Sequence, residues 1–178
     1  MNLLEAKNLY KSFGNINAVS DISISLNVGE VIGFLGPNGA GKSTTMKMLT
    51  GFLEADSGSI EIKKIDLSKD PINAKSIIGY LPEGAPSYSD MTVKSFLYFV
   101  GKMRGLKDEL LEKRLEIMLK DINLSEVQNQ IIETLSKGYK RRVGIAQALI
   151  HDPDILILDE PTDCLLYTSD AADDVECV

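Results

Sequence analysis

The stretch GPNGAGKS, Gly36 to Ser43, decides the fold that this sequence predicts. It matches the phosphate-binding loop pattern G-x-x-x-x-G-K-[ST], and it follows the apolar run VIGFL. That run lacks polar alternation, as expected for a strand covered on both faces of a parallel sheet. The segment KSTTMKMLTG is expected to form a helix that stops at Gly51. Strand, loop and helix in this order predict an α/β domain with a phosphate site.

The residues of this loop have expected roles in binding ATP and Mg²⁺. Glycines at three positions let the backbone wrap around phosphate oxygens and point several N–H groups at them. Lys42 is expected to bridge the β- and γ-phosphates, and Ser43 to offer its hydroxyl to Mg²⁺ at the positive end of the helix. A glycine-rich turn with a chance lysine is the alternative, and the flanking strand and helix argue against it. The predicted nucleotide contacts are Gly36, Pro37, Asn38, Gly39, Ala40, Gly41, Lys42, Ser43 and Thr44.

Two adjacent carboxylates follow a second apolar run, ILIL, and complete the predicted chemistry. Asp159 and Glu160 would stand at the carboxyl end of a buried strand, where open α/β sheets bind their ligands. Asp159 is expected to hold Mg²⁺, and Glu160 to take a proton from an attacking water molecule, so that Glu160 and Lys42 form the catalytic pair. Taken alone, such a pair would usually be a solvated strand end; the phosphate loop in the same chain favours the functional interpretation.

The stretch LSKGYKRRVGIAQAL, Leu135 to Leu149, is similar to the signature motif of ATP-binding cassette (ABC) proteins, Leu-Ser-Gly-Gly-Gln followed by a helix. It lies just before HDPDILILDEP, as in that family, and the resemblance covers residues 1–163. Ser136 would cap the helix and, with the N–H of Gly138, face an anion. An ordinary capped helix explains this stretch alone, but not the order of the three motifs. Lys137 and Tyr139 replace the usual Gly and Gln.

The resemblance implies an α/β fold: a P-loop NTPase core of the ABC ATPase type, with an antiparallel β subdomain and a helical insertion at about residues 88–150. It also implies ATP hydrolysis in a dimer, homo- or heteromeric, in which each signature reaches the γ-phosphate on the other cassette. A separately encoded membrane permease would be driven by this subunit, placing it in the cytoplasm, peripheral on the inner face of the cell membrane. No nucleic acid partner is expected.

Two further positions carry roles that the resemblance implies. Phe13 falls where the family stacks an aromatic ring on adenine, although Tyr10 is close by and either ring could be core. Glu83 stands in place of the glutamine that senses the γ-phosphate and Mg²⁺; its carboxylate could approach the metal, or it could be a solvated loop acid. The surrounding LPEGAPSYSDMTV resembles ABC-2 type exporters, which sets the expected subtype.

Hydrophobic periodicity predicts the remaining elements. Residues 22–28 alternate as a half-buried strand, and strands are also expected near residues 57–67 and 77–81. Helical spacing begins after the cap Thr92 and ends at Gly105, and a third helix runs from about Ser136 to His151. His151, the only histidine, is read as a helix-end residue. The second helix is defined by Leu110, Leu111, Leu115, Met118 and Leu119.

Composition sets limits on the function. The 178 residues carry a net charge of −7, of which the four acidic residues after position 163 contribute four, so the body gives no sign of a nucleic-acid-binding face. Both cysteines, Cys164 and Cys177, also lie after position 163, and a cysteine-free body fits a reducing compartment. No apolar run is long enough to cross a bilayer, so any membrane role is expected to need a partner.

The ending CLLYTSDAADD, Cys164 to Asp174, resembles one reading frame of a transposon-type sequencing adapter. A divergent natural tail is the alternative. We therefore expect a nucleotide-binding domain over residues 1–163, incomplete at its C-terminus, and a non-native tail over residues 164–178. Two other functions stay open: a soluble ABC protein acting on ribosomes or DNA, and a fragment that is inactive as it stands.

Overall fold

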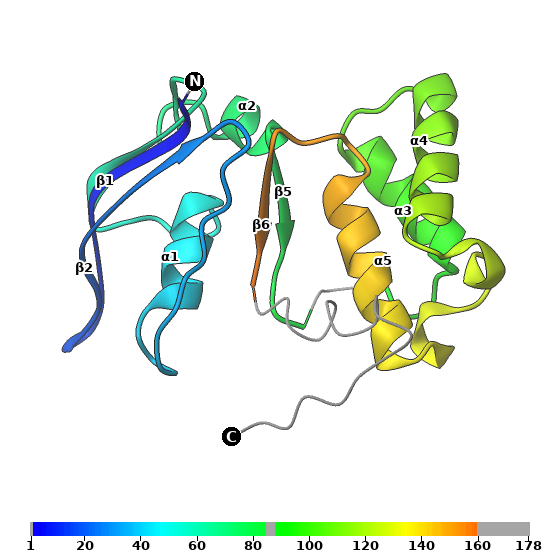
Figure 1. The fold of residues 1–178 in the computed structure, drawn as a ribbon, viewed down its shortest axis with the longest axis horizontal. Coiled ribbons are helices and arrows are strands. Elements are labelled where there is room, and N and C mark those ends of the chain that lie inside the picture. Colours follow the sequence, from blue (N-terminus) through cyan, green and yellow to red (C-terminus); the bar gives the residue numbers. More distant parts are fainter. Residues whose placement is uncertain (1, 85–87, 160–178) are drawn as a thin grey trace, which may run out of the picture. The chain divides into compact units, whose positions relative to one another are not determined.

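The computed structural model describes residues 2–84 and 88–159 of the chain (Figure 1). Within them the chain forms two compact units. The first unit runs to Tyr80 and includes His151–Asp159, and the second comprises Leu81–Ile150. The fold is α/β, and the first unit contains both sheets of the described residues except for the end of one strand.

The larger sheet of the first unit is antiparallel. Its strands are β1 (Asn2–Phe13), β2 (Ile16–Asn27), β3 (Ser57–Ile62) and β4 (Ile65–Asp66), in the order β2-β1-β3-β4. Leu4 is central to the register, since it pairs with Leu26 on one side and Ile62 on the other. The expected antiparallel β subdomain is confirmed. Strand β1 pairs with two strands that come later in the chain, β2 and β3.

Two helices accompany this sheet. Helix α1 (Lys42–Leu49) follows the glycine-rich loop and ends as expected at Gly51, where the N–H of Phe52 donates to the Lys47 carbonyl at 2.9 Å. Helix α2 (Pro71–Ser76) is short and has Asp70 as its cap, whose carboxylate accepts from the N–H of Asn73 at 3.3 Å. Met48 and Leu49 of α1 are buried in the core of this unit.

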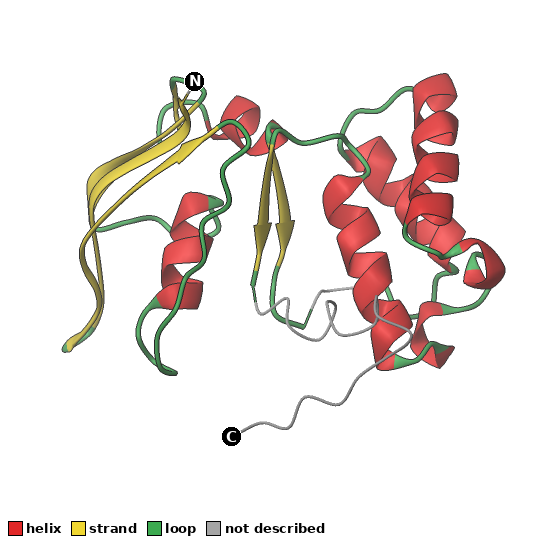
Figure 2. Cartoon of the chain, viewed as in Figure 1, coloured by secondary structure: helices red, strands yellow, loops and turns green. Residues whose placement is uncertain are grey.

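The second sheet pairs β5 (Ile78–Leu81) with β6 (Ile155–Leu158), which are distant in sequence. Their arrows point the same way, so the pair is parallel (Figure 2). The N–H of Ile155 donates to the Ile77 carbonyl at 3.2 Å, which places Ile155 opposite Ile78. Both expected strands are confirmed. The core of this unit comprises Leu3, Leu4, Ala6, Leu9, Val19, Met48, Leu49, Ile60, Ile62, Leu67, Ala74, Ile78 and Ile155.

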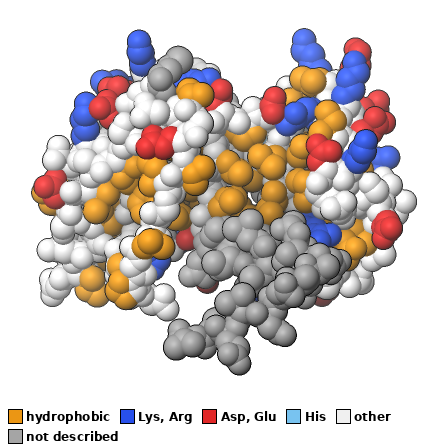
Figure 3. Space-filling model, viewed as in Figure 1, with side chains coloured by type: hydrophobic (Ala, Val, Ile, Leu, Met, Phe, Trp, Pro, Cys, Tyr) orange, Lys and Arg blue, Asp and Glu red, His pale blue; other side chains and the backbone are white. Residues whose placement is uncertain are grey.

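The predicted buried strand before the loop is not formed. Residues 30–37 have no regular secondary structure, and Val31 and Leu35 are 95% and 96% exposed. A strand exists only through hydrogen bonds to a neighbour, and neither sheet of the described residues includes this segment. Hydrophobic side chains also reach the surface on the face drawn in Figure 3. The most exposed large hydrophobic residues include Ile16, Val31, Leu35, Phe52, Ile72 and Met103.

The second unit is helical. It contains α3 (Val93–Met103), α4 (Asp108–Asp121), two single 3₁₀ turns (Ser125–Val127 and Ile132–Thr134) and α5 (Lys137–Leu149). Thr92 caps α3 as predicted, because its hydroxyl accepts from the N–H of Ser95 at 3.2 Å. None of the helices within the described parts of the chain is long and apolar enough to cross a membrane.

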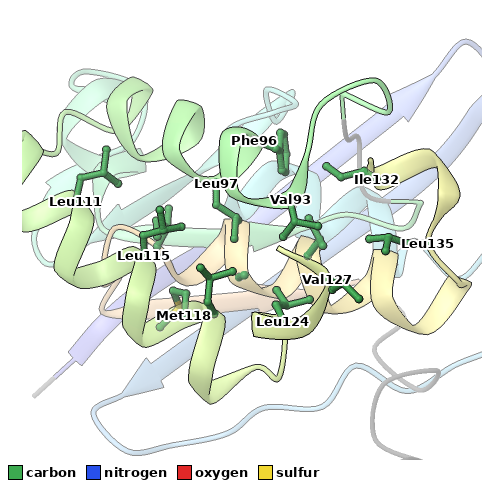
Figure 4. Packing of buried hydrophobic residues seen from close by; sticks show 14 residues of the cluster. Val93, Phe96, Leu97, Leu111, Leu115, Met118, Leu124, Val127, Ile132 and Leu135 are labelled. Carbon is green, nitrogen blue, oxygen red and sulfur yellow. The ribbon is translucent and has the colours of Figure 1, made fainter. Parts of the chain in front are cut away.

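The three long helices share one hydrophobic core (Figure 4). Phe96 and Leu97 of α3, Leu111 and Leu115 of α4, and Val143 of α5 belong to the same cluster. Leu110, predicted to lie on the buried face of α4, is 51% exposed, because the apolar face of the helix passes through its neighbour Leu111 instead. The periodicity therefore located the helix correctly and one of its core positions wrongly.

The end of α5 is secured from a neighbouring helix. Helix α5 has no basic residue in its last turn, and its C-terminal cap is Ile150 rather than a glycine. The guanidinium of Arg114, on α4, donates to the carbonyls of Leu149 and Ile150 at 3.0 and 3.2 Å. These are carbonyls at the end of the helix, where no further helical N–H follows. A side chain of α4 therefore takes the place of a local cap.

Candidate nucleotide-binding site

The glycine-rich loop has a backbone that only glycine accommodates well at two of its positions. Gly39 and Gly41 have φ angles of 84° and 82°, in the left-handed region. A Cβ atom at Gly41 would collide with the carbonyl oxygen of Ala18, on β2. The loop is closed between these positions by the N–H of Ala40, which donates to the Pro37 carbonyl at 3.2 Å. The sequence pattern at this loop is therefore required by its geometry.

Helix α1 presents its N-terminus to the loop. The N–H of Thr45 donates to the Gly41 carbonyl at 2.8 Å and makes the first helical hydrogen bond. The N–H groups of Lys42, Ser43 and Thr44 precede that bond, and Gly41 at the cap position has no side chain to accept from them. These groups and the positive end of the helix dipole suit an anion such as a phosphate.

The Lys42 side chain contacts the backbone at the start of the same loop. Its ammonium donates to the carbonyl of Gly36 at 2.7 Å and to that of Pro37 at 2.9 Å. The long side chain therefore folds back along the loop, and the positive charge stands beside the backbone that phosphates would approach. A compact ammonium with three donors can keep one carbonyl while it binds a phosphate oxygen.

Ser43 and Asp159, the two predicted Mg²⁺ ligands of the first unit, lie together. The Ser43 hydroxyl donates to an Asp159 carboxylate oxygen at 3.2 Å, across 116 residues of sequence. Asp159 is only 3% exposed, directly after β6. Within residues 2–84 and 88–159 there is no cluster of three or more histidine, cysteine or acidic side chains that could hold a metal. A hydroxyl with one carboxylate suits Mg²⁺, which keeps water and phosphate oxygens as its other ligands.

The sequence did not indicate that Tyr80, on β5, would lie near this pair. Tyr80 is 8% exposed, and its ring packs against Phe52 with centroids 5.4 Å apart. Burial, and then the negative charge of Asp159, raise the pKa of the Tyr80 phenol. A polar aromatic residue within the apolar strand IIGYL was the only available signal, and it does not reveal which strand lies beside β5.

Phe13, the predicted adenine-stacking residue, ends β1 and is 49% exposed. The ammonium of Lys11 lies 5.8 Å from the centroid of its ring and is fixed by Asp56 at 2.6 Å. Tyr10, the alternative, is 41% exposed. Neither ring is buried in the core, so each has a face available for stacking, and the choice of Phe13 stays a prediction.

The other predicted site residues belong to the second unit or lie outside the described residues. Glu83 is exposed in the turn after β5. Ser136 caps α5 as expected, since its hydroxyl accepts from the N–H of Tyr139 at 3.4 Å, and both Ser136 and Gly138 are exposed. The ring of Tyr139, in place of the usual Gln, carries the guanidinium of Arg142 at 5.3 Å from its centroid. Glu160 and the tail from residue 164 are among the residues that are not described.

A glycine-rich loop that opens a helix, with a buried carboxylate on the adjoining strand, defines the class of phosphate-loop nucleotide-binding proteins. The family model described as "ABC transporter" matches residues 19–163. The chain therefore belongs to the ABC transporter family, and its fold is that of the ATP-binding cassette.

Curated relatives agree with this assignment. The chain is 43% identical to the linearmycin resistance ATP-binding protein LnrL of Bacillus subtilis, over 90% of this chain and 51% of that protein. It is 38% identical to the lipopolysaccharide export system ATP-binding protein LptB of Haemophilus influenzae, over 90% of this chain and 68% of that protein. The chain spans about half the length of LnrL and of the B. subtilis protein YxlF, of which it covers 51% and 54%.

Solved structures agree as well. The ATP-binding subunit of an ABC transporter superposes with a TM-score of 0.82 at 32% identity, over 89% of this chain and 66% of that one. An ATP-binding cassette solved in its ADP conformation superposes with a TM-score of 0.75 at 30% identity, over 90% of this chain and 69% of that one. The expected P-loop NTPase core of the ABC type is confirmed.

Proposed function

We propose that this chain binds and hydrolyses MgATP as the nucleotide-binding subunit of an ABC-2 type exporter. The observation that carries the proposal is the hydrogen bond between Ser43 and Asp159. It joins the phosphate loop to the carboxylate strand, and a metal ion on a β- or γ-phosphate needs ligands from both. The membership of the ABC transporter family supports the same activity.

When bound, MgATP supplies the phosphoanhydride bond that is broken and the metal charge that neutralises the phosphates. The backbone N–H groups at the start of α1 and the Lys42 ammonium hold and orient the phosphates. Ser43 and Asp159 hold the metal, and Glu83 adds a carboxylate that responds to it. Glu160 accepts the proton of the attacking water, and Phe13 stacks on the base.

The exporter subtype and the partners extend the family assignment. LnrL is named for linearmycin resistance, and YbhF of Escherichia coli as a probable multidrug transporter protein, which supports export as the direction. The chain pairs with a second cassette, whose Ser136 and Gly138 complete each site, and with a separate permease. That partner places it on the inner face of the cell membrane, without any role for nucleic acid.

One observation favours a second candidate, that the 178-residue chain alone has no normal turnover. Val31 and Leu35 are almost fully exposed directly before the phosphate loop. A loop whose leading segment is not packed in a sheet positions phosphates less firmly, which lowers the rate of hydrolysis more than it lowers nucleotide binding. Binding and turnover are therefore measured separately.

Binding of a fluorescent ATP analogue (mant-ATP) to the chain tests the proposal. Lys42→Ala is expected to weaken the affinity at least about tenfold, because it removes a charge-assisted bond to the phosphates. Lys47→Ala, in the last turn of the same helix, is the matched control and is expected to bind as the wild type does. Equal affinities of Lys42→Ala and wild type would contradict the proposed site.

A further inference from the structure

Tyr80 has a buried hydroxyl without a hydrogen-bond partner among the residues that the structure describes. Its side chain is 92% buried, and within the described residues its hydroxyl oxygen has no hydrogen-bond partner. A buried hydroxyl without a partner costs free energy that a phenylalanine would avoid. Such groups call for an explanation, and a bound ion or an ordered water molecule is a common one.

The strand pairing sets where this hydroxyl lies. Ile155 is opposite Ile78, so Ile157 is opposite Tyr80, two residues further along both strands. Opposed side chains of a parallel pair point to the same face, and side chains alternate along each strand. Asp159 follows Ile157 by two residues. The Tyr80 side chain therefore lies on the same face as that of Ile157. Directly after β6 comes Asp159, which accepts from Ser43 of α1 and whose charge reaches the Tyr80 phenol.

Two properties fit a role beside this carboxylate. The Phe52 ring, three residues after α1, packs against the phenol at a tilt of 56°. The Asp159 carboxyl group is buried, and its oxygens accept hydrogen bonds, whereas a phenol donates one. Burial, and then the negative charge of Asp159, raise the pKa of the Tyr80 phenol, which shows that the two groups are close enough to interact.

We propose that Tyr80 is a positioning residue for Asp159. Its hydroxyl donates through an ordered water molecule to the Asp159 carboxylate. This holds the carboxylate in the orientation in which it contacts Ser43 and would bind Mg²⁺. The inference rests on the proposed function, since it concerns the same metal site. Strand β5 would then contribute a residue that orients a metal ligand, in addition to the ligands on the phosphate loop and after β6.

Tyr80→Phe removes one oxygen and keeps the ring on Phe52. The measured quantity is the gain in mant-ATP affinity when Mg²⁺ replaces EDTA. We expect Tyr80→Phe to reduce this gain about fivefold, the effect of one hydrogen bond to a charged group, and to leave the affinity in EDTA unchanged. Tyr98→Phe is the matched control, because the Tyr98 hydroxyl donates to the Asp108 carboxylate at 2.7 Å in the second unit. It is expected to behave as the wild type.

A spectroscopic measurement separates this inference from the proposed function. In chain labelled with ¹³C at the tyrosine Cζ, Tyr80→Phe identifies the Tyr80 signal. Asp159→Asn is expected to shift that signal and to leave the Tyr98 signal in place. If the wild type showed no Mg²⁺-dependent gain, the proposed function would fail, while this shift would still support the pairing of Tyr80 with Asp159.

The opposite results would overturn the inference. If Tyr80→Phe kept the wild-type gain in mant-ATP affinity from Mg²⁺ and melted at a higher temperature, the hydroxyl would only destabilise the fold and would have no role at the metal. An unchanged Tyr80 signal in Asp159→Asn would exclude the contact. The melting temperature also guards against a misfolded variant, since loss of folding would lower the affinity in EDTA too.

Discussion

At Gly41 a side chain is excluded for two independent reasons. The backbone has a φ of 82°, and the position of a Cβ atom is taken by the Ala18 carbonyl of β2. The first reason is local, whereas the second depends on how closely β2 approaches the loop. The residue therefore couples the loop to the antiparallel sheet, and the sequence motif alone does not reveal this contact.

Gly41→Ala is expected to lower the free energy of unfolding by about 2–4 kcal/mol, from backbone strain added to a collision. Gly14→Ala is the control, because Gly14 also has a positive φ, 59°, but nothing lies within 4 Å of its added Cβ. The control is expected to lose only about 1 kcal/mol. Urea unfolding measures both, and equal losses would show that the Ala18 carbonyl moves aside freely.

At the scale of single elements, the helices of the second unit start at defined caps. Thr92 and Lys107 occupy the N-cap positions of α3 and α4 with nearly the same ψ, 155° and 153°. Only Thr92 accepts a hydrogen bond from the helix that it precedes. The pair therefore isolates the contribution of a capping side chain from that of the cap backbone.

Thr92→Ala is expected to destabilise the chain by about 1 kcal/mol, the usual cost of a lost N-cap. Lys107→Ala, whose side chain makes no capping bond, is expected to change the stability by less than about 0.5 kcal/mol. Chemical denaturation gives both values. A Lys107→Ala variant as unstable as Thr92→Ala would mean that side-chain capping is not what holds α3.

Elements with local signals were predictable from the sequence, and elements with distant partners were less so. The spacing of Val93, Phe96 and Leu97 and the cap Thr92 specify α3 within one segment. Residues 31–35 have an equally clear apolar pattern, but a strand needs a neighbouring strand to bond, and periodicity does not supply one. In the site, motifs predicted Ser43 and Asp159. Tyr80 was not predicted as a site residue, because its position depends on the parallel pairing of β5 with β6.

At the scale of the whole molecule, the exposed segment before the loop is the main departure from expectation. Val31 and Leu35 are almost fully exposed to solvent, whereas thirteen residues of the same unit are buried in its core. Exposed apolar segments of this kind promote association between molecules. Self-association of the chain is therefore expected to begin at residues 31–35.

Val31→Ser combined with Leu35→Ser is expected to reduce light scattering of concentrated solutions and to change the free energy of unfolding by less than about 0.5 kcal/mol per site. Val19→Ser is the control for a buried position, since Val19 is 5% exposed, and it is expected to cost about 2 kcal/mol or more. A loss of that size in the double variant would mean that residues 31–35 form a buried strand in solution, as the sequence predicted.

The hydrogen bonds from Arg114 to the end of α5 couple the unfolding of α4 to that of α5. A helix with a local cap frays on its own, whereas α5 keeps its last carbonyls bonded only as long as α4 remains folded. Amide hydrogens near Leu149 should therefore exchange with solvent at the same rate as those around Arg114, in one cooperative opening. The end of α5 thus depends on a helix that contributes no predicted ligand to the site.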